Sequence, residues 1–534
     1  MPTLLQQWIT AHAQRSPEAA AVVAEGERVT YGQLDARANQ FARVLRELGC
    51  GRGDRVAILA ANSPTAIAAI LGVLRADAVY VPLDPSSPPS RLGRILASSE
   101  PAWILAAGGA GELLDALVAM QPAEARSHVA WIDTDRMPAS RLTPMFTRRD
   151  LDACPAGPIA SRIDASAIAY IMYTSGSTGV PKGVAVTHAS IIAFVEWAVR
   201  YFGMDATDRT SGHAPLYFDL STFDLFGTFA AGAELHIVPP ALNLLPQKLA
   251  RFIRDAELTQ WFSVPSALNY MARFDVARQD DFPHMRRLLW CGEVFPTPSL
   301  IYWMKRLPHV QFTNLYGPTE TTVASTYHTV PACPTDERAA IPIGRPCGGE
   351  QVRVLDESMA PVPAGVSGEI YIGGAGLSPG YWRDPDRTRQ AFVRDPRNGQ
   401  ERLYRTGDLG RFDDQGDLYF LGRVDSQIKS RGYRIELGEV ESALNALGML
   451  QECAVVAPPT EGFEGRIICC AYAPLPGQSL APSQLRSALQ RKLPTYMLPS
   501  RWVQFERLPK NLNGKIDRRQ LTSYFQGHET AAAG

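Results

Sequence analysis

The chain has 534 residues, a length that predicts two or more domains and a large hydrophobic core. Apolar residues make up 46% and charged residues 20% of it, and 53 Lys and Arg against 54 Asp and Glu leave a formal net charge of −1. This balance excludes a general electrostatic attraction to nucleic acid or to an anionic membrane.

The N-terminal segment predicts a short amphipathic helix, because Leu4, Leu5, Trp8 and Ile9 fall on one face at helical spacing. The segment has neither the basic start nor the long apolar run of a signal peptide. No part of the chain reaches the roughly 18 uninterrupted apolar residues of a membrane-spanning helix. We therefore expect a cytosolic protein.

Apolar runs alternate with helical patterns over the first two-thirds of the chain. Buried strands are predicted at 54–61, 78–83, 169–175, 233–239, 259–264 and 286–292. Helical patterns lie between them, among others at 63–76 and 223–232. This alternation predicts layers of helices and sheets, an α/β architecture.

The remaining third of the chain has a different pattern. Residues 330–380 are rich in Pro and Gly and include two short β-like pieces, at 350–356 and 368–374. A helical pattern at 436–448, strand-like runs at 451–458 and 466–473 and a helix at 483–493 follow. We therefore expect a large N-terminal domain of layered α/β subdomains plus a β-rich subdomain, and a small mobile α+β domain at the C-terminus.

The eight cysteines are scattered and form neither a CxxC pair nor a Cys/His cluster with the spacing of metal ligands. Cys469 and Cys470 lie in the apolar run RIICCAYA and read as small buried residues of a strand. The sequence thus disfavours a zinc site and fits reduced thiols in the cytosol.

The segment YTSGSTGVPKGV (173–184) has the composition of a loop that binds phosphate. Its glycines allow close approach of the backbone to a ligand, and its hydroxyls and Lys182 supply donors and a positive charge. It is not a Walker A loop, because Pro181 precedes Lys182 and Gly183 follows it. The alternative is a flexible surface loop, which the strongly apolar strand before it disfavours.

Four further segments accompany this loop: NLYGPTETT (314–322), YRTGDLGR (404–411), GRVDSQIKSRGYRIELGEVE (422–441) and NLNGKIDRR (511–519). In their order and separations the five segments resemble the adenylate-forming superfamily, which includes acyl-CoA synthetases, luciferases and the adenylation domains of nonribosomal peptide synthetases. The resemblance covers essentially the whole chain. It is strongest to the amino-acid-activating adenylation domains.

The resemblance implies a reaction in two steps. A carboxylate attacks the α-phosphate of ATP, which gives an acyl adenylate and pyrophosphate, and a phosphopantetheine thiol of a carrier protein then takes the acyl group as a thioester. Both steps shift negative charge on oxygen atoms, so the protein must supply cations and hydrogen-bond donors. The implied cofactors are ATP and Mg²⁺.

Matching positions assign roles at the nucleotide site. Glu320 would hold Mg²⁺, Thr319 would donate to the α-phosphate, and Lys182 would assist at the phosphates. Tyr316 would stack on adenine, Asn314 would bond its edge, and Asp408 would accept the ribose hydroxyls with Arg423 beside it. The full nucleotide set adds Thr174, Ser175, Gly176, Ser177, Thr178, Gly179, Gly292, Glu293 and Gly317. The loop 173–184 would wrap the β- and γ-phosphates.

The resemblance also implies a moving C-terminal domain. Lys515 matches the lysine that reaches between the substrate carboxylate and the α-phosphate, where a compact positive charge offsets the repulsion of two anions. Asp425 matches the hinge, about which the small domain rotates between the two steps. In the second pose Lys429 and Gly432 would face the thiol. These assignments predict domains at 1–424 and 425–534.

The acyl substrate is read from HAPLYFDLSTFDLF (213–226). Asp219 matches the aspartate that pairs with the ammonium of an amino acid; the alternative is a cap of the following helix. The side-chain-reading positions fall on Leu220, Phe223, Ser263, Leu289, Cys291, Leu315, Val323 and Ala324. This lining carries no further charge, so we expect a small to medium apolar side chain.

The lining resembles two subfamilies, the L-proline-activating enzymes and the D-alanine–carrier protein ligases, and β-amino-acid activators are a third possibility. Proline or another compact apolar amino acid is favoured, since Phe223 and Leu315 depart from the D-alanine type. An acid–CoA ligase and an inactive binding homologue are the alternatives of other classes. No carrier domain follows Lys515 in this sequence, so the resemblance implies a free-standing enzyme with a separate carrier protein, and neither nucleic acid nor membrane as partner.

Overall fold

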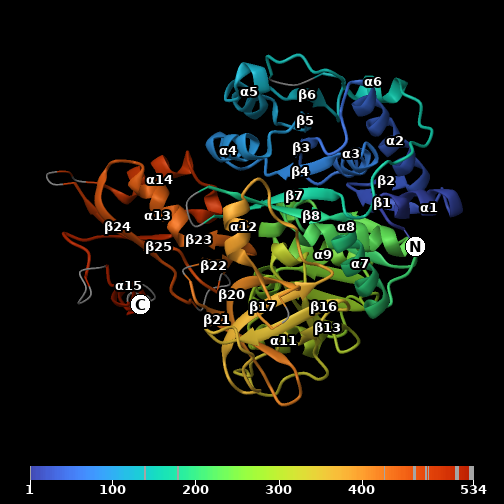
Figure 1. The fold of residues 1–534 in the computed structure, drawn as a ribbon. Helices are drawn as coiled ribbons and strands as arrows, with labels where there is room; N and C mark the ends of the chain where they lie inside the picture. The colour runs from blue at the N-terminus through green and yellow to red at the C-terminus, as the bar shows by residue number, and fades with distance from the viewer. Residues whose placement is uncertain are drawn as a thin grey trace.

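The computed structural model describes residues 2–136, 140–176, 180–397, 399–425, 427–460, 465–475, 478, 480–510 and 516–527 (Figure 1). The predicted fold class is confirmed. Two large sheets and a smaller β-rich unit form the N-terminal part, and a small α+β unit in orange and red lies at one side of it (Figure 1).

The first large sheet has seven strands in the order β18-β8-β7-β4-β3-β5-β6. The inner pairings from β7 to β6 are parallel, and β7 pairs antiparallel with β8. The strands are β3 (Arg55–Leu59), β4 (Val79–Leu83), β5 (Trp103–Ala106), β6 (His128–Trp131), β7 (Ile168–Thr174), β8 (Lys182–Thr187) and β18 (Gly380–Tyr381).

The second large sheet has nine strands in the order β15-β14-β13-β12-β11-β9-β10-β1-β2. Its centre, from β13 to β1, is parallel. The strands are β1 (Ala20–Ala24), β2 (Glu27–Thr30), β9 (Arg209–Gly212), β10 (Glu234–Ile237), β11 (Gln260–Ser263), β12 (Arg287–Cys291), β13 (Gln311–Tyr316), β14 (Thr326–Thr329) and β15 (Arg345–Pro346).

Helices fill the space between these sheets and cover their outer faces. The inner layer consists of α1 (Gln7–Arg15), α2 (Tyr31–Glu47), α3 (Pro64–Arg75), α7 (His188–Phe202) and α8 (Leu220–Ala231), and its side chains share one core with both sheets. The outer faces carry α4 (Pro89–Ser99) and α5 (Gly111–Ala119) on one side, and α9 (Pro246–Asp255), α10 (Pro265–Arg273) and α11 (Thr297–Arg306) on the other. The result is the alternation of layers that the sequence predicts.

The Pro- and Gly-rich region and the residues after it form a five-stranded sheet of β16 (Glu350–Leu355), β17 (Gly368–Gly374), β19 (Phe392–Arg394), β20 (Arg402–Phe412) and β21 (Leu418–Arg423). Alternate residues of these strands pack with Tyr316 and Ile343, so the sheet is joined to the end of β13. The shorter helices of this half are α6 (Arg148–Ala153) and α12 (Pro385–Ala391), and the 3-10 turns are η1 (Ala123–Ala125), η2 (Pro240–Leu244) and η3 (Thr319–Thr321).

The C-terminal unit begins with a two-stranded hairpin of β22 (Gln427–Ser430) and β23 (Tyr433–Glu436). A three-stranded sheet of β24 (Leu450–Val456), β25 (Cys469–Pro474) and β26 (Arg501–Gln504) follows, with α13 (Leu437–Asn445), α14 (Pro482–Gln490), η4 (Thr495–Met497) and α15 (Arg518–Gly527). Cys469 and Cys470 are buried on opposite faces of β25, as a strand requires. The expectation of small core cysteines is confirmed.

Parallel strand order determines which loops meet. The carboxyl ends of β9, β11, β12 and β13 lie at one edge of the nine-stranded sheet, and these strands together with the segments after them carry more than half of the predicted site residues. Within the described ranges no helix is long and apolar enough to cross a membrane.

Candidate functional site

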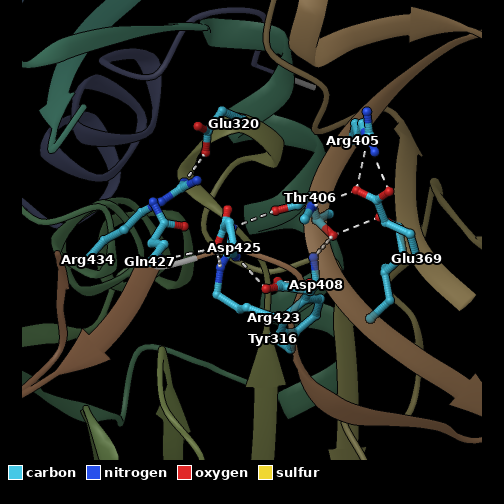
Figure 2. Close-up of polar contacts among 12 residues, drawn as sticks. Tyr316, Glu320, Glu369, Arg405, Thr406, Asp408, Arg423, Asp425, Gln427 and Arg434 are labelled. Carbon is cyan, nitrogen blue, oxygen red and sulfur yellow. Dashed lines mark hydrogen bonds and ion pairs between the residues drawn. The ribbon is translucent and has the colours of Figure 1, made fainter. Parts of the chain in front are cut away.

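A buried carboxylate with three polar partners lies where the two large sheets and the small C-terminal unit meet. Glu320, in η3 directly after β13, has no exposed surface. Lys182 Nζ lies 2.9 Å and the Tyr381 hydroxyl 2.7 Å from its Oε1. Arg434 Nη1 lies 2.7 Å from its Oε2, a contact that Figure 2 shows. Strands β8 and β18 supply the first two partners, and β23 of the C-terminal hairpin supplies the third.

The charges of this cluster depend on one another. Burial alone would raise the pKa of Glu320, but Arg434 and Lys182 outweigh it and hold that pKa well below its usual range. Burial and the neighbouring Arg434 lower the pKa of Lys182 to about 8, although Glu320 opposes the shift. Two cations therefore face one buried anion.

A second carboxylate, Asp408 of β20, is buried beside the β-rich sheet. It accepts a hydrogen bond of 2.6 Å from the Tyr316 hydroxyl and an ion pair from Arg423 Nη1. The same Arg423 donates from Nε and Nη2 to the two carboxylate oxygens of Asp425, in hydrogen bonds of 2.8 Å each (Figure 2). Arg423 thus bridges the predicted ribose acceptor and the predicted hinge residue.

The predicted adenine-binding residues border a cavity of about 660 Å³ between the two units. Asn314 donates from Nδ2 to the Pro342 carbonyl at 2.8 Å. The ammonium nitrogen of Lys429 lies over the ring of Tyr316, 5.5 Å from the centre of that ring. The predicted nucleotide residues that line this cavity are Gly292, Glu293, Asn314, Tyr316, Asp408 and Arg423; Leu315, predicted to read the substrate, lines it as well.

A smaller cavity of about 120 Å³ lies beside it, and Asp219 forms part of its wall. Oδ2 of Asp219 accepts a hydrogen bond of 2.5 Å from Thr319 Oγ1. Burial raises the pKa of Asp219, whereas that hydrogen bond and the nearby Lys429 lower it. The effect of burial is the larger, so the pKa lies above its ordinary value. The side chain makes no capping hydrogen bond to α8, so the structure does not support the alternative that it caps this helix.

Apart from Leu315, which lines the larger cavity, the predicted side-chain-reading positions divide into two groups. Leu220 and Cys291 line the small cavity together with Asp219. The others lie behind this wall, each with at most 1% of its surface exposed: Phe223, Ser263, Leu289, Val323 and Ala324. Phe223 is held by Phe194, Phe202 and Phe262, with ring centres 5.5, 6.2 and 5.6 Å away. A rigid aromatic cluster therefore backs the small cavity.

The glycine-rich segment is described only in part. Thr174 ends β7, and the hydroxyl of Ser175 donates to the Arg434 carbonyl at 2.5 Å. A Cβ on Gly176 would meet the Val180 carbonyl oxygen at 2.2 Å, so this position requires glycine. Ser177, Thr178 and Gly179 lie outside the described residues, and so does Lys515.

The hairpin of β22 and β23 brings the predicted thiol-facing residues to the site. Gly432 has φ +79° and donates its N–H to Glu293 Oε1 at 2.9 Å. A Cβ there would lie 2.5 Å from Val264 Cγ1. Gly317 is equally confined, since a Cβ on it would meet the Ala324 Cα at 2.6 Å. Thr319 and Gly317 border the small cavity with Gly432.

Sequence reasoning gave no role to several residues that the structure brings here. Arg434 and Glu439 lie in the quoted segment 422–441, but their partners Glu320 and Arg91 are distant in sequence. Tyr381 lies at the end of the Pro- and Gly-rich region, and its hydroxyl reaches Glu320 only because β18 pairs with β8. No local pattern identifies such partners.

Comparisons with known proteins agree with this arrangement. A family profile described as "AMP-binding enzyme" matches residues 9–382, and one described as "AMP-binding enzyme C-terminal domain" matches residues 439–515. The chain is 34% identical over 526 residues to tyrocidine synthase 3 of Brevibacillus parabrevis, and 35% identical over 513 residues to surfactin synthase subunit 2 of Bacillus subtilis (strain 168). These matches cover 98% and 95% of this chain but span only 8% and 13% of the two relatives.

Solved structures show the same fold over nearly the whole chain. The Vibrio cholerae adenylation domain AlmE, in complex with glycyl-adenosine-5'-phosphate, superimposes with a TM-score of 0.85 at 26% identity, covering 99% of this chain and 98% of that one. Holo-PA1221, an NRPS protein containing adenylation and PCP domains, gives a TM-score of 0.79 at 28% identity, covering 97% of this chain and 84% of that one.

Proposed function

The chain belongs to the AMP-binding enzyme family, and on this basis we propose that it activates a small to medium apolar amino acid, such as L-proline, for transfer to a carrier protein. A carboxylate oxygen of the amino acid attacks the α-phosphorus of ATP, and the bond to the bridging oxygen breaks, so that pyrophosphate leaves. The thiol of a phosphopantetheine arm then attacks the carbonyl carbon. AMP leaves, and the thiol proton passes to solvent.

One observation carries the amino-acid part of this proposal: the buried carboxylate of Asp219 forms no ion pair with another described residue, and burial raises its pKa more than the Thr319 hydroxyl, the more distant Lys429 and the Leu220 backbone lower it. A buried carboxylate is costly unless a cation or several donors compensate it. The ammonium of an amino acid supplies that cation. An amine-free acid would instead place its own carboxylate near an uncompensated anion.

The remaining roles follow from the cluster around Glu320 and Asp408. Glu320 fits a magnesium ligand, since Mg²⁺ is commonly held by one or two carboxylates together with substrate phosphates. When bound, the ion neutralises charge on the phosphate oxygens. Lys182 adds a positive charge beside Glu320, and Thr319 offers a hydroxyl at the small cavity. When the nucleotide binds, Asp408 would lose its contact with Tyr316 or Arg423 and accept hydrogen bonds from the ribose hydroxyls instead. Lys515 would stabilise the meeting of the carboxylate and the α-phosphate.

The wall of the small cavity supports a compact substrate. Leu220 and Cys291 are apolar or weakly polar, and the aromatic cluster of Phe223 lies behind them. A charged side chain would meet no partner at Leu220, Cys291 or the predicted positions behind them, although Lys429 and Arg434 border the same cavity. The AlmE complex contains a glycyl adenylate, so glycine joins proline, D-alanine and β-amino acids as a substrate to be compared.

The test is amino-acid-dependent ATP–pyrophosphate exchange. The panel contains L-proline, glycine, D- and L-alanine, β-alanine, L-lysine and L-glutamate, and the matching acids that lack the amine. We expect exchange with one or a few compact apolar amino acids and, in a separate assay with that amino acid in labelled form, transfer of the aminoacyl group to an added holo-carrier protein. Exchange with amine-free acids alone would assign the chain to the acid–CoA ligases. No exchange, with ATP bound normally, would indicate an inactive homologue.

A further inference from the structure

A second buried ion pair crosses between the large N-terminal part and the small C-terminal unit. Arg91 of α4 pairs through Nη1 with Oε1 of Glu439 on α13, and the two residues are 5% and 1% exposed. Met497 Sδ lies 3.9 Å from the same Arg91 nitrogen. Oε2 of Glu439 has no hydrogen-bond partner among the described residues. Arg91 is the cation that forms an ion pair with Glu439, and Arg94 also interacts with this carboxylate electrostatically.

This pair is buried only because the two units are docked. Across the same interface Arg434 contacts Glu320 and Tyr404, and Phe218 meets Tyr433 edge-on with ring centres 4.8 Å apart. Tyr496 of the small unit stacks on the same Tyr433, with ring centres 3.5 Å apart. Ser90 donates to the Arg491 carbonyl at 2.8 Å. When the small unit rotates away, Arg91 and Glu439 separate and both become hydrated.

The docked orientation suits the second half-reaction rather than the first. Arg434 engages Oε2 of Glu320, while Lys182 and Tyr381 engage Oε1. A magnesium ion on Glu320 would have to displace at least one of these partners, and Arg434 is the one that leaves with the small unit. Gly432 and Glu293 are joined in this orientation, and they border the cavities where a thiol would arrive.

A buried ion pair contributes little net stability, because desolvation of both charges offsets their attraction. Removal of one partner, however, leaves a buried charge without compensation and strongly disfavours the state that buries it. A pair of this kind therefore selects one arrangement over others. Here the arrangement selected is the docked orientation of the small unit.

We propose that Arg91 and Glu439 are positioning residues for thioester formation, which hold the small unit in the orientation of the second half-reaction and take no part in adenylation. The proposal rests on the proposed two-step function. It assigns the pair neither a contact with substrate nor a proton transfer. Its effect passes through the hairpin of β22 and β23, which follows the orientation of α13.

The first experiment is hydrogen exchange on the ligand-free full chain, which needs no assumption about the reaction. Glu439→Gln removes the anion and leaves Arg91 buried without a partner. We expect amide exchange of hairpin residues 427–436 to become at least about tenfold faster, while β24 and β25 remain protected. Glu441→Gln is the matched control, since Glu441 lies on the same helix and pairs with Arg518 inside the small unit.

The second experiment separates the two half-reactions. We expect Glu439→Gln to leave ATP–pyrophosphate exchange within about twofold of the wild type and to lower the rate constant of carrier loading roughly a hundredfold, with the KM for the amino acid unchanged. The double variant Arg91→Met with Glu439→Gln removes both charges and should recover most of the loading rate, because neither charge is then buried alone. Glu439 is the primary position because Arg91 also borders the small cavity.

The outcomes are distinguishable. Unchanged hairpin exchange and unchanged loading in Glu439→Gln would overturn the proposal, as would an equal loss in both half-reactions. A double variant as slow as the single one would also overturn it, since the pair would then act by something other than mutual compensation. Absence of pyrophosphate exchange in the wild type would refute the proposed function instead, and the hairpin exchange would still decide whether the pair holds the docked orientation.

Discussion

At the scale of single residues, Asp219 gives the most direct prediction. We expect Asp219→Asn to reduce pyrophosphate exchange with the preferred amino acid by about 100-fold, because the ammonium loses a buried counter-ion worth about 3 kcal/mol. The discrimination between the amino acid and its amine-free analogue should fall by a similar factor. Parallel exchange assays with both substrates measure it.

The control for this prediction lies five residues further along. Asp224 is buried on α8, accepts an N–H bond from Ala214 at 3.2 Å and is not among the cavity-lining residues. Asp224→Asn should retain the preference for the amine even if its stability changes. A loss of amine preference in Asp224→Asn as large as that in Asp219→Asn would refute the specific role of Asp219.

Glu350 gives a prediction about stability and pH. Burial raises its pKa from 4.5 to about 7, and the Gly376 N–H, 2.6 Å from Oε1, opposes the shift only in part. Between these two values the native state holds a proton that the unfolded chain has lost, so stability falls as pH rises through this range and levels off above about 7.

Glu350→Gln removes this penalty and keeps an acceptor for Gly376. We expect the variant to be more stable than the wild type by about 2 kcal/mol at pH 8, with solvent screening of the side chain already allowed for. The gain should shrink as the pH is lowered and vanish near pH 4. Denaturant titrations at several pH values test this, and a gain that does not depend on pH would contradict it.

At the scale of elements, the hairpin of β22 and β23 depends on one glycine. Gly432→Ala forces a Cβ to within 2.5 Å of Val264 and adds the strain of a positive φ, +79°. We expect carrier loading to fall at least tenfold, whereas pyrophosphate exchange should persist. Gly448 provides the control, because it has a φ of +65° but nothing within 4 Å of an added Cβ. Equal effects of Gly448→Ala and Gly432→Ala on loading would assign the loss to backbone strain alone.

Helix α8 gives a prediction about substrate size. Phe223→Leu should enlarge the space behind Leu220 and raise the relative exchange rate of amino acids one or two methylenes larger by about tenfold. Phe226→Leu, a change of a buried residue on the same helix, is the control for general loosening of the core. An unchanged size preference in Phe223→Leu would remove Phe223 from the substrate-reading positions.

Element types were largely predictable from the sequence, and their partnerships were not. The runs at 54–61, 259–264 and 286–292 contain β3, β11 and β12, because continuous apolar residues with flanking turn signals are typical of buried parallel strands. The pairing of β18 with β8 and the contact of Arg434 with Glu320 join segments that are distant in the chain. Such contacts depend on how whole units dock, which periodicity does not encode. The roles of Glu320, Asp408 and Asp219 were predicted only because their motifs resemble those of a known family.

At the scale of the whole molecule, Arg434 occupies the Oε2 position of Glu320, where it would compete with a magnesium ion. We expect MgATP to displace Arg434 and undock the small unit, so that amide exchange of residues 427–436 becomes faster when MgATP is added. Arg434→Gln should weaken the docked state and lower the Mg²⁺ concentration needed for half-maximal pyrophosphate exchange by about tenfold. Faster hairpin exchange with ATP and EDTA, to the same extent as with MgATP, would show that the nucleotide alone causes the change.

Arg423 adds a consequence of another kind, because one guanidinium binds both Asp408 and Asp425. A ribose that competes with Arg423 for Asp408 would also change the contact between Arg423 and Asp425. It would thereby change the free energy of rotation about the predicted hinge at Asp425. The two effects are thermodynamically linked. If the bound ribose changes the equilibrium constant for rotation by some factor, rotation changes the affinity for the ribose by the same factor. With the proposed rotation, nucleotide affinity would therefore differ between the two orientations, and AMP should be released more readily from one of them.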